Sequence, residues 1–121
     1  MRSASTVEIK TSNLTPAFIA TVSASELLEL FPVNFEGLDP LQAPEPSSLA
    51  LLHFASGPAA IVFGSETGTI TVSLPDDDDA PRIFDELIAE VPLGDRIQWI
   101  REDLAERNIR SIQRRVSRTR R

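Results

Sequence analysis

The amino-acid sequence predicts an α+β fold: an antiparallel sheet of about four to six strands with two or three helices packed on one face. Three observations lead to this prediction. Strand-like segments occur in runs and do not alternate one by one with helices. The clearest strand alternates apolar and hydroxyl side chains, which is typical of a sheet with one covered face and one wet face. Two later segments carry the spacing of apolar residues that is typical of helices.

The first elements are two strand-like segments. Residues 6–10 read TVEIK, in which Val7 and Ile9 point to one side and the polar residues to the other. Residues 18–22 repeat this two-residue period. The TSNLTP segment between them has the chemistry of a turn, so the sequence predicts a hairpin.

A short helix follows the second strand. Ser23 and Glu26 have the spacing of a capping box, in which each side chain bonds the other residue's free backbone N–H group. Leucines and a phenylalanine follow this pair. Pro32 ends the helix, because proline disfavours helical geometry in the residue before it.

Residues 33–48 are rich in proline and acidic residues, which excludes regular structure. A loop of this length inside a compact domain is unusual. Its large apolar residues are Val33, Phe35, Leu38 and Leu41. We interpret the segment as a cover whose apolar residues fill the core, and the functional alternative is a partner-binding loop.

Three strands are predicted next, at residues 49–54, 59–63 and 68–74. Short connections that contain glycine separate them, as in β-hairpins. In the third strand Ile70, Val72 and Leu74 are predicted to face the core.

The C-terminal third begins with a predicted helix at residues 81–90, whose apolar residues form a helical stripe. Pro92 and Gly94 end it, and Asp95 is a candidate cap for a second helix. The apolar residues assigned to this second helix are Ile97, Ile100 and Leu104.

Asn108 is predicted to stop the second helix, since asparagine tolerates the left-handed geometry of a helix end. The apolar residues that follow lie about 100° round from the first stripe. Residues 109–117 are therefore either a kinked continuation or a final strand, and we expect a strand that ends in a frayed tail.

Charge divides this chain of 121 residues more clearly than hydropathy does. Residues 1–106 hold all 18 acidic residues and five of the 12 basic ones, a formal charge of −13. Residues 107–121 hold seven arginines and no acid, a charge of +7. We therefore predict a single acidic α+β domain over 1–106 and an arginine-rich C-terminal segment over 107–121.

The residue inventory argues against catalysis and against cofactors. The chain has no cysteine and no tyrosine, one histidine and one lysine. His53 lies within an apolar strand, where a structural role is expected, and one histidine cannot supply the ligands of a zinc site. No glycine-rich nucleotide loop is present. We predict no catalytic residue, no metal ligand and no cofactor.

Two charged segments remain as candidate partner-binding sites. The first is an acidic run before the predicted helix: Asp76, Asp77, Asp78 and Asp79. Adjacent carboxylates diverge from one backbone segment, which does not suit a calcium cage. Asp78 or Asp79 is a candidate helix cap, with Pro81 in the first turn. This leaves two aspartates for a basic partner.

The second candidate site consists of arginines in the C-terminal segment: Arg110, Arg114, Arg115, Arg118, Arg120 and Arg121. Dense arginine binds phosphate or an acidic protein surface, or it only forms a disordered, solubilising end without a specific role. The segment lacks aromatic residues for base stacking, and the acidic body repels nucleic acid. These features favour a protein partner.

We therefore expect a small, non-enzymatic regulatory or interaction module that acts by electrostatic recognition. The alternative is a nucleic-acid-associated accessory protein that uses the segment as a nonspecific phosphate clamp. A homo-oligomer is consistent with the first function. The sequence shows no secretory signal and no apolar run of about 20 residues, so a soluble, cytoplasmic protein without membrane contact is expected. The lack of cysteine fits an intracellular bacterial or archaeal protein, and we expect a bacterial source.

Overall fold

The computed structural model describes residues 1–4, 11–37 and 47–119, apart from the side chains at positions 11, 111 and 114–119. Its strands are β1 (Arg2–Ser3), β2 (Leu14–Thr21), β3 (Ser47–Phe54), β4 (Gly57–Gly64), β5 (Thr69–Pro75) and β6 (Ile97–Ile100). Its helices are α1 (Ala24–Leu30), α2 (Ala80–Glu90) and α3 (Glu102–Thr119), with 3₁₀ turns η1 (Thr11–Asn13) and η2 (Gly94–Arg96).

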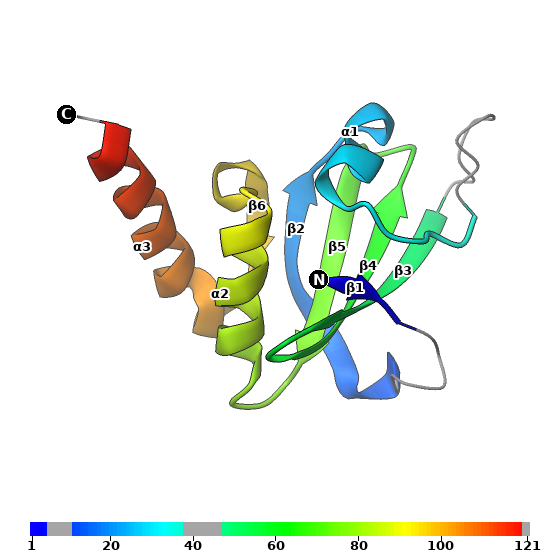
Figure 1. Cartoon of the computed structure of the whole chain (residues 1–121), viewed down its shortest axis with the longest axis horizontal. Helices are drawn as coiled ribbons and strands as arrows, with labels where there is room; N and C mark the ends of the chain where they lie inside the picture. Colours follow the sequence, from blue (N-terminus) through cyan, green and yellow to red (C-terminus); the bar gives the residue numbers. More distant parts are fainter. Residues whose placement is uncertain (5–10, 38–46, 120–121) are drawn as a thin grey trace.

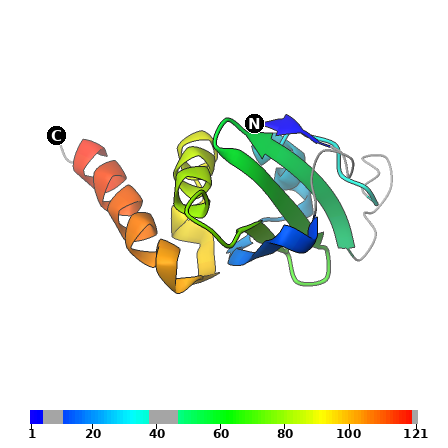
Figure 2. The same ribbon diagram turned by 90° about the horizontal axis from the view of Figure 1, so that it is seen from below.

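Within these residues the strands form one open antiparallel sheet of six strands, in the order β1-β3-β4-β5-β2-β6. Three α-helices accompany it (Figure 1). The predicted α+β class is confirmed. Figure 2 shows the same chain from below, with α3 leaning away from α2 and from the sheet.

The strands β3, β4 and β5 form the predicted meander. A two-residue turn joins β3 to β4, and Gly57 after this turn has φ 149°. A Cβ atom at Gly57 would lie 2.8 Å from Ile83 Cδ1, so glycine also lets α2 approach the turn closely. Gly68 ends the next turn at φ 65°, a conformation that favours glycine.

Residues 6–10 lie outside the described part, but the predicted hairpin between them and residues 18–22 is wrong, because β5 and β6 already pair with both edges of this strand. The second predicted strand is confirmed as β2, which begins earlier, at Leu14. Its neighbours are β5 and β6. A register shift between Pro16 and Phe18 brings Ala17 and Phe18 both into the core.

The core lies on one face of the sheet, beneath α1 and α2. The inward side chains of β5 are fully buried, while the alternate Thr69, Thr71 and Ser73 are half-exposed, as predicted. Leu27 of α1 and Leu87 of α2 belong to the same buried cluster. The Phe84 ring of α2 meets Phe18 of β2 edge to face, with ring centroids 5.6 Å apart.

The opposite face of the sheet carries a cross-strand row. Strand pairing aligns these residues in the order Trp99, Ile19, Thr71, Val62 and Leu49. Near this row Leu51 and Ala60 form a small separate buried cluster. His53 lies on the same face of β3 as Leu51 and is half-buried, in line with a structural role.

The segment after α1 contributes to the core as far as the structure describes it. Phe35 is buried, and Val33 packs against the main cluster. A bridge between Glu36 and Leu49 ties the segment to β3. These contacts agree with the core-filling interpretation for residues 33–37, whereas Leu38 and Leu41 fall in residues 38–46, outside the described part.

The capping box at the start of α1 is confirmed. The Ser23 N–H and Ser23 Oγ donate to Glu26 Oε1 at 3.3 and 3.0 Å. Arg96 of η2 adds an ion pair, with 2.7 Å between its Nη1 and Glu26 Oε2. The hydrogen bond from Arg96 above all, and those from Ser23, lower the pKa of Glu26 from its ordinary value of 4.5.

This lowered pKa predicts a pH-dependent contribution to stability. Because the folded protein holds Glu26 ionised, its contribution is present above pH 4.5 and is lost as the pH falls through the folded pKa. We expect Glu26→Gln to lower the urea midpoint at pH 7 and to differ less from the wild type at about pH 3. Glu29→Gln, at an exposed position of the same helix, is the control. A difference between wild type and Glu26→Gln that grows in acid would contradict the assignment.

The second predicted C-terminal helix exists, but it begins later than expected, at Glu102. Residues 94–96 form the turn η2, and residues 97–100 form strand β6. β6 pairs with β2, and the Arg101 N–H group donates to the Ala17 carbonyl at 2.7 Å. The free edge of β2 thus gains backbone partners, and this pairing outweighs the helical spacing of Ile97 and Ile100.

The expected final strand at residues 109–117 is also wrong, because they continue α3. Asn108 does not stop the helix: it lies in the middle, is buried, and donates from Nδ2 to the Gly94 carbonyl at 3.3 Å. The helix begins at Glu102, so Leu104, Asn108 and Ile112 share one face at four-residue intervals. The predicted rotation of about 100° between the two apolar stripes was calculated from a stripe that included Ile97 and Ile100. These two residues belong to β6 and not to the helix.

Candidate interaction site

The aspartate run lies in the turn between β5 and α2. Asp76, Asp77 and Asp78 are exposed, and Asp79 is half-buried. Asp77 Oδ1 accepts a hydrogen bond from the Asp79 N–H group at 2.9 Å, which stabilises the turn locally. Asp79 forms an ion pair with Arg82, one turn into α2.

The predicted helix cap is confirmed in position but not in chemistry. Asp79 occupies the cap position of α2, and Pro81 lies in the first turn. The Asp79 side chain makes no capping hydrogen bond, and the backbone of Asp79 has helical φ and ψ angles. Asp77 thus has a local role as the acceptor of the Asp79 N–H group, and Asp79 has one as the partner of Arg82. Asp76 and Asp78 have no such local role in the turn.

The arginine-rich segment lies largely within α3. Its first arginine, Arg107, forms an ion pair with Asp85 of α2 and so joins the two helices. Arg110 pairs with Glu106 one turn earlier, at 2.6 Å, and both side chains are well exposed. Arg114, Arg115 and Arg118 are in the described backbone of α3, but their side chains are outside the description. Arg120 and Arg121 lie outside it altogether.

Helical spacing places four arginine positions along one side of α3. Positions 107, 110, 114 and 118 follow one another at intervals of three, four and four residues. Among the described side chains of α3, Leu104, Asn108 and Ile112 lie toward the body, whereas Ile109, on another side of the helix, is 54% exposed. The predicted boundary at residue 107 thus marks a change of charge and not of structure, because α3 continues through it without a break.

The two charged segments are not neighbours. α2 and α3 stand side by side and run in the same direction (Figure 1). The β5–α2 turn, which holds the aspartates, lies at the start of this pair of helices. The last turns of α3 lie at the other end. The structure therefore presents an acidic turn and an arginine-bearing helix as two separate surfaces.

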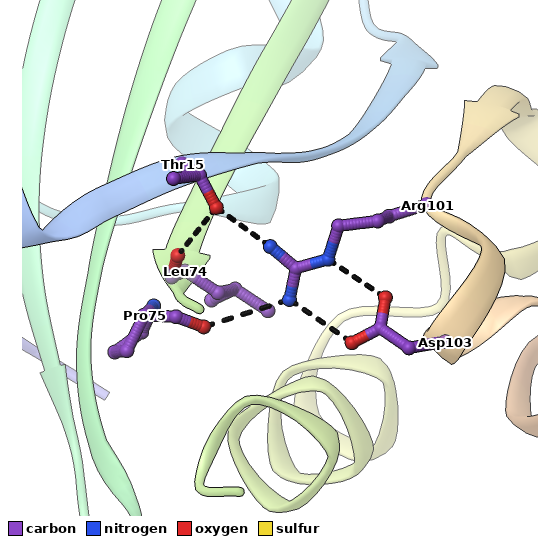
Figure 3. A network of polar contacts seen from close by, with 5 residues as sticks. All are labelled: Thr15, Leu74, Pro75, Arg101 and Asp103. Carbon is purple, nitrogen blue, oxygen red and sulfur yellow. Dashed lines mark hydrogen bonds and ion pairs between the residues drawn. The ribbon is translucent and has the colours of Figure 1, made fainter. Parts of the chain in front are cut away.

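Arg101, which the sequence analysis did not single out, organises the junction between β6 and α3 (Figure 3). Its Nη1 donates to Thr15 Oγ1 at 2.7 Å, and its Nη2 to the Pro75 carbonyl at 3.5 Å. Its Nε and Nη2 donate to the two carboxylate oxygens of Asp103 at 2.7 and 3.2 Å. The Arg101 side chain is 18% exposed. Thr15 and Pro75 are distant in sequence, so no local pattern marks this network.

A close contact between α3 and η2 fixes the helix further along. A Cβ atom at Gly94 would lie 3.0 Å from Asn108 Oδ1 and 3.4 Å from Ile112 Cγ1. The absence of a side chain at Gly94 allows α3 to approach this closely. Arg101, just before α3, and Arg107 and Asn108, in its second turn, thus hold the first half of the helix on the body.

Neither a metal centre nor a membrane span is found in the part of the chain that the structure describes. No group of three or more histidine, cysteine, aspartate or glutamate side chains there is arranged to hold a metal ion. Among the same residues, no helix is long and apolar enough to cross a membrane. Comparisons with protein-family models, with curated proteins and with solved structures found no match.

Proposed function

We propose that this protein is a non-enzymatic interaction module that binds an acidic protein surface through the arginine side of α3. The proposal rests on one observation, the helical backbone of residues 107–119. They continue a helix whose first half is anchored to the body, so the arginine positions are presented in a fixed array. A preorganised array loses less conformational entropy on binding than a disordered tail does.

The charge distribution supports a protein partner over nucleic acid. Residues 1–106 hold all 18 acidic residues, which repel phosphate at any extended nucleic-acid interface. The acids also reach into α3 itself, at Glu102, Asp103 and Glu106. A compact acidic patch can meet the arginine positions near the end of α3 without approaching this acidic body.

The acidic turn is a second, separate contact in this proposal, for a basic partner. Asp76 and Asp78 are exposed carboxylates at the start of α2, away from the last turns of α3. Their separation from the arginines favours two partners, or two parts of one partner, over an internal charge pair.

The proposal is tested by fluorescence anisotropy with labelled poly-L-glutamate and a labelled 20-base-pair DNA duplex, at about 50 and 300 mM salt. We expect poly-L-glutamate to bind at low salt and to weaken as salt rises. The variant Arg110→Gln/Arg114→Gln/Arg118→Gln should weaken this binding by about tenfold or more, because three charges are lost. Arg82→Gln, an exposed arginine on α2, is the matched control and should bind as the wild type does.

Two results would contradict the proposal: no binding of poly-L-glutamate at low salt, or tighter binding of the duplex, which would favour the phosphate clamp. The acidic turn is tested in the same assay with poly-L-lysine. The variant Asp76→Asn/Asp78→Asn should bind it more weakly than the wild type, and equal binding would exclude the acidic turn as a contact.

A further inference from the structure

The sheet is open at its β6 end. Within the described residues β6 is the last strand in the order, and its only neighbour in the sheet is β2. Edge strands in natural proteins often carry a lysine, a proline or an inward-pointing charge, which discourages further pairing. Residues 97–100 read IQWI and contain none of these. The outer edge of β6 (the open edge) therefore has no side chain that repels another strand.

The register of β6 shows which backbone groups face the open edge. The Arg101 N–H group donates to the Ala17 carbonyl. The residue opposite Phe18 is Ile100, and in an antiparallel ladder this makes them a non-hydrogen-bonded pair. The N–H and C=O groups of Ile100 therefore point away from β2, whereas those of Trp99 point toward it. The open edge thus presents a backbone donor and a backbone acceptor, groups that require hydrogen-bond partners.

Two exposed apolar side chains lie in the two layers that meet at β6. Among the described residues the most exposed large apolar side chains are Ile109, at 54%, and Trp99, at 47%. Trp99 is on the face of the sheet that α1 and α2 leave uncovered, where it ends the cross-strand row. Ile109 belongs to α3, which follows β6 in the chain and stands beside α2 in the helix layer (Figure 1).

Ile109 lies on the side of α3 that faces the open edge. Arg107 contacts α2, and the Ile112 side chain lies close to Gly94 of η2. At 100° per residue, Ile109 is about 60° beyond Ile112, on the side away from Arg107. Since η2 leads directly into β6, this side of α3 faces the region next to β6. In both views no other described helix or strand lies there (Figures 1 and 2).

We propose that the open edge binds an extended apolar segment of a partner protein, which joins the sheet as a seventh strand. The backbone of this segment bonds to Ile100, and its side chains alternate between the two faces, toward Ile109 and toward Trp99. β6 has only four residues and its pairing is irregular at one end, so the binding is weak. Arginine positions 107, 110, 114 and 118 lie on another side of α3, so this inference does not rest on the proposed function.

A segment of another protein fits this edge better than a second copy of the chain does. Antiparallel pairing of two β6 strands about a twofold axis would keep both helix layers on the same face of the joined sheet. Because α3 extends past β6 on that face, the two α3 helices would meet over the shared edge (Figure 2). A separate extended segment brings no such helix.

The single tryptophan and the backbone amides report the binding. The probe is a capped hexapeptide of alternating valine and threonine, titrated to about 1 mM into the full chain. We expect the Trp99 fluorescence to shift to shorter wavelength. Hydrogen exchange of the Ile100 amide should become slower by about tenfold or more, while the Trp99 amide, which already faces β2, changes little. If either the fluorescence shift or the Ile100 protection is absent at the highest peptide concentration, the proposal is overturned.

Two controls separate strand addition from general apolar contact. The same peptide with every amide N-methylated keeps its side chains but has no backbone donors, so it should not bind. Ile109→Glu should weaken binding of the unmodified peptide by about tenfold, because it places a charge beside the added strand, whereas Leu28→Glu, on α1, should not. Undiminished binding in either test would contradict strand addition. Ile100 protection that grows with protein concentration without peptide would identify a second copy as the occupant and would also overturn the proposal.

Discussion

Phe84→Ala is expected to lower the free energy of unfolding by about 3–5 kcal/mol, the range for large-to-small changes at fully buried aromatic residues. The Phe84 ring is fully buried and meets Phe18 edge to face, so truncation removes an aromatic pair and leaves a cavity. The contact joins α2 to β2, next to the strand pair that fixes β6. Urea unfolding followed by circular dichroism measures the change.

Two controls separate this cavity effect from other effects of substitution on a helix. Phe84→Leu keeps most of the apolar volume and should cost clearly less than Phe84→Ala. Leu28→Ala, at a position 38% exposed on α1, should change the stability by about 0.5 kcal/mol or less. A loss below about 1 kcal/mol for Phe84→Ala would contradict the packing of α2 on β2.

Arg101→Ala is expected to cost about 2–3 kcal/mol, because hydrogen bonds to a largely buried charge are worth more than those between neutral groups. The guanidinium holds Thr15 of β2, the Pro75 carbonyl at the end of β5 and the Asp103 carboxylate at the start of α3 (Figure 3). Its loss leaves the partly buried Thr15 hydroxyl and Pro75 carbonyl without this donor.

The matched control for Arg101→Ala is Arg82→Ala. Arg82 also pairs with a nearby aspartate, but its side chain is 68% exposed, and exposed ion pairs contribute about 1 kcal/mol or less. Arg101→Ala should in addition raise amide hydrogen exchange in the first turns of α3, because the anchor of that helix is lost. Equal stability losses for the two variants would contradict the anchoring role of Arg101.

The charge of the two candidate surfaces could be predicted from the sequence, but their contacts and their secondary structure could not. The aspartate run and the arginines are visible in the sequence, and their chemistry follows from composition alone. The sequence did not reveal that Asp77 stabilises the turn or that Arg107 pairs with Asp85 across two helices. It also did not reveal that residues 109–117 continue α3, with Ile109 exposed on the surface of that helix.

Local signals by themselves determined the elements whose stabilising contacts are near in sequence. The capping box at Ser23 defines the start of α1, alternating residues define β5, and a helical stripe with Pro81 in the first turn defines α2. These elements are bounded by turns, caps and periodicities that span a few residues.

Only the tertiary structure decided the elements that depend on distant partners. Residues 97–100 carry a helical spacing, yet they form β6 because the open edge of β2 offers backbone hydrogen bonds some 80 residues away in sequence. That strand delays the start of the next helix to Glu102, which rotates the buried face onto Leu104 and Asn108. The side of α3 that packs on the body, and hence the side left for a partner, follows from this long-range pairing and not from the helix's own sequence.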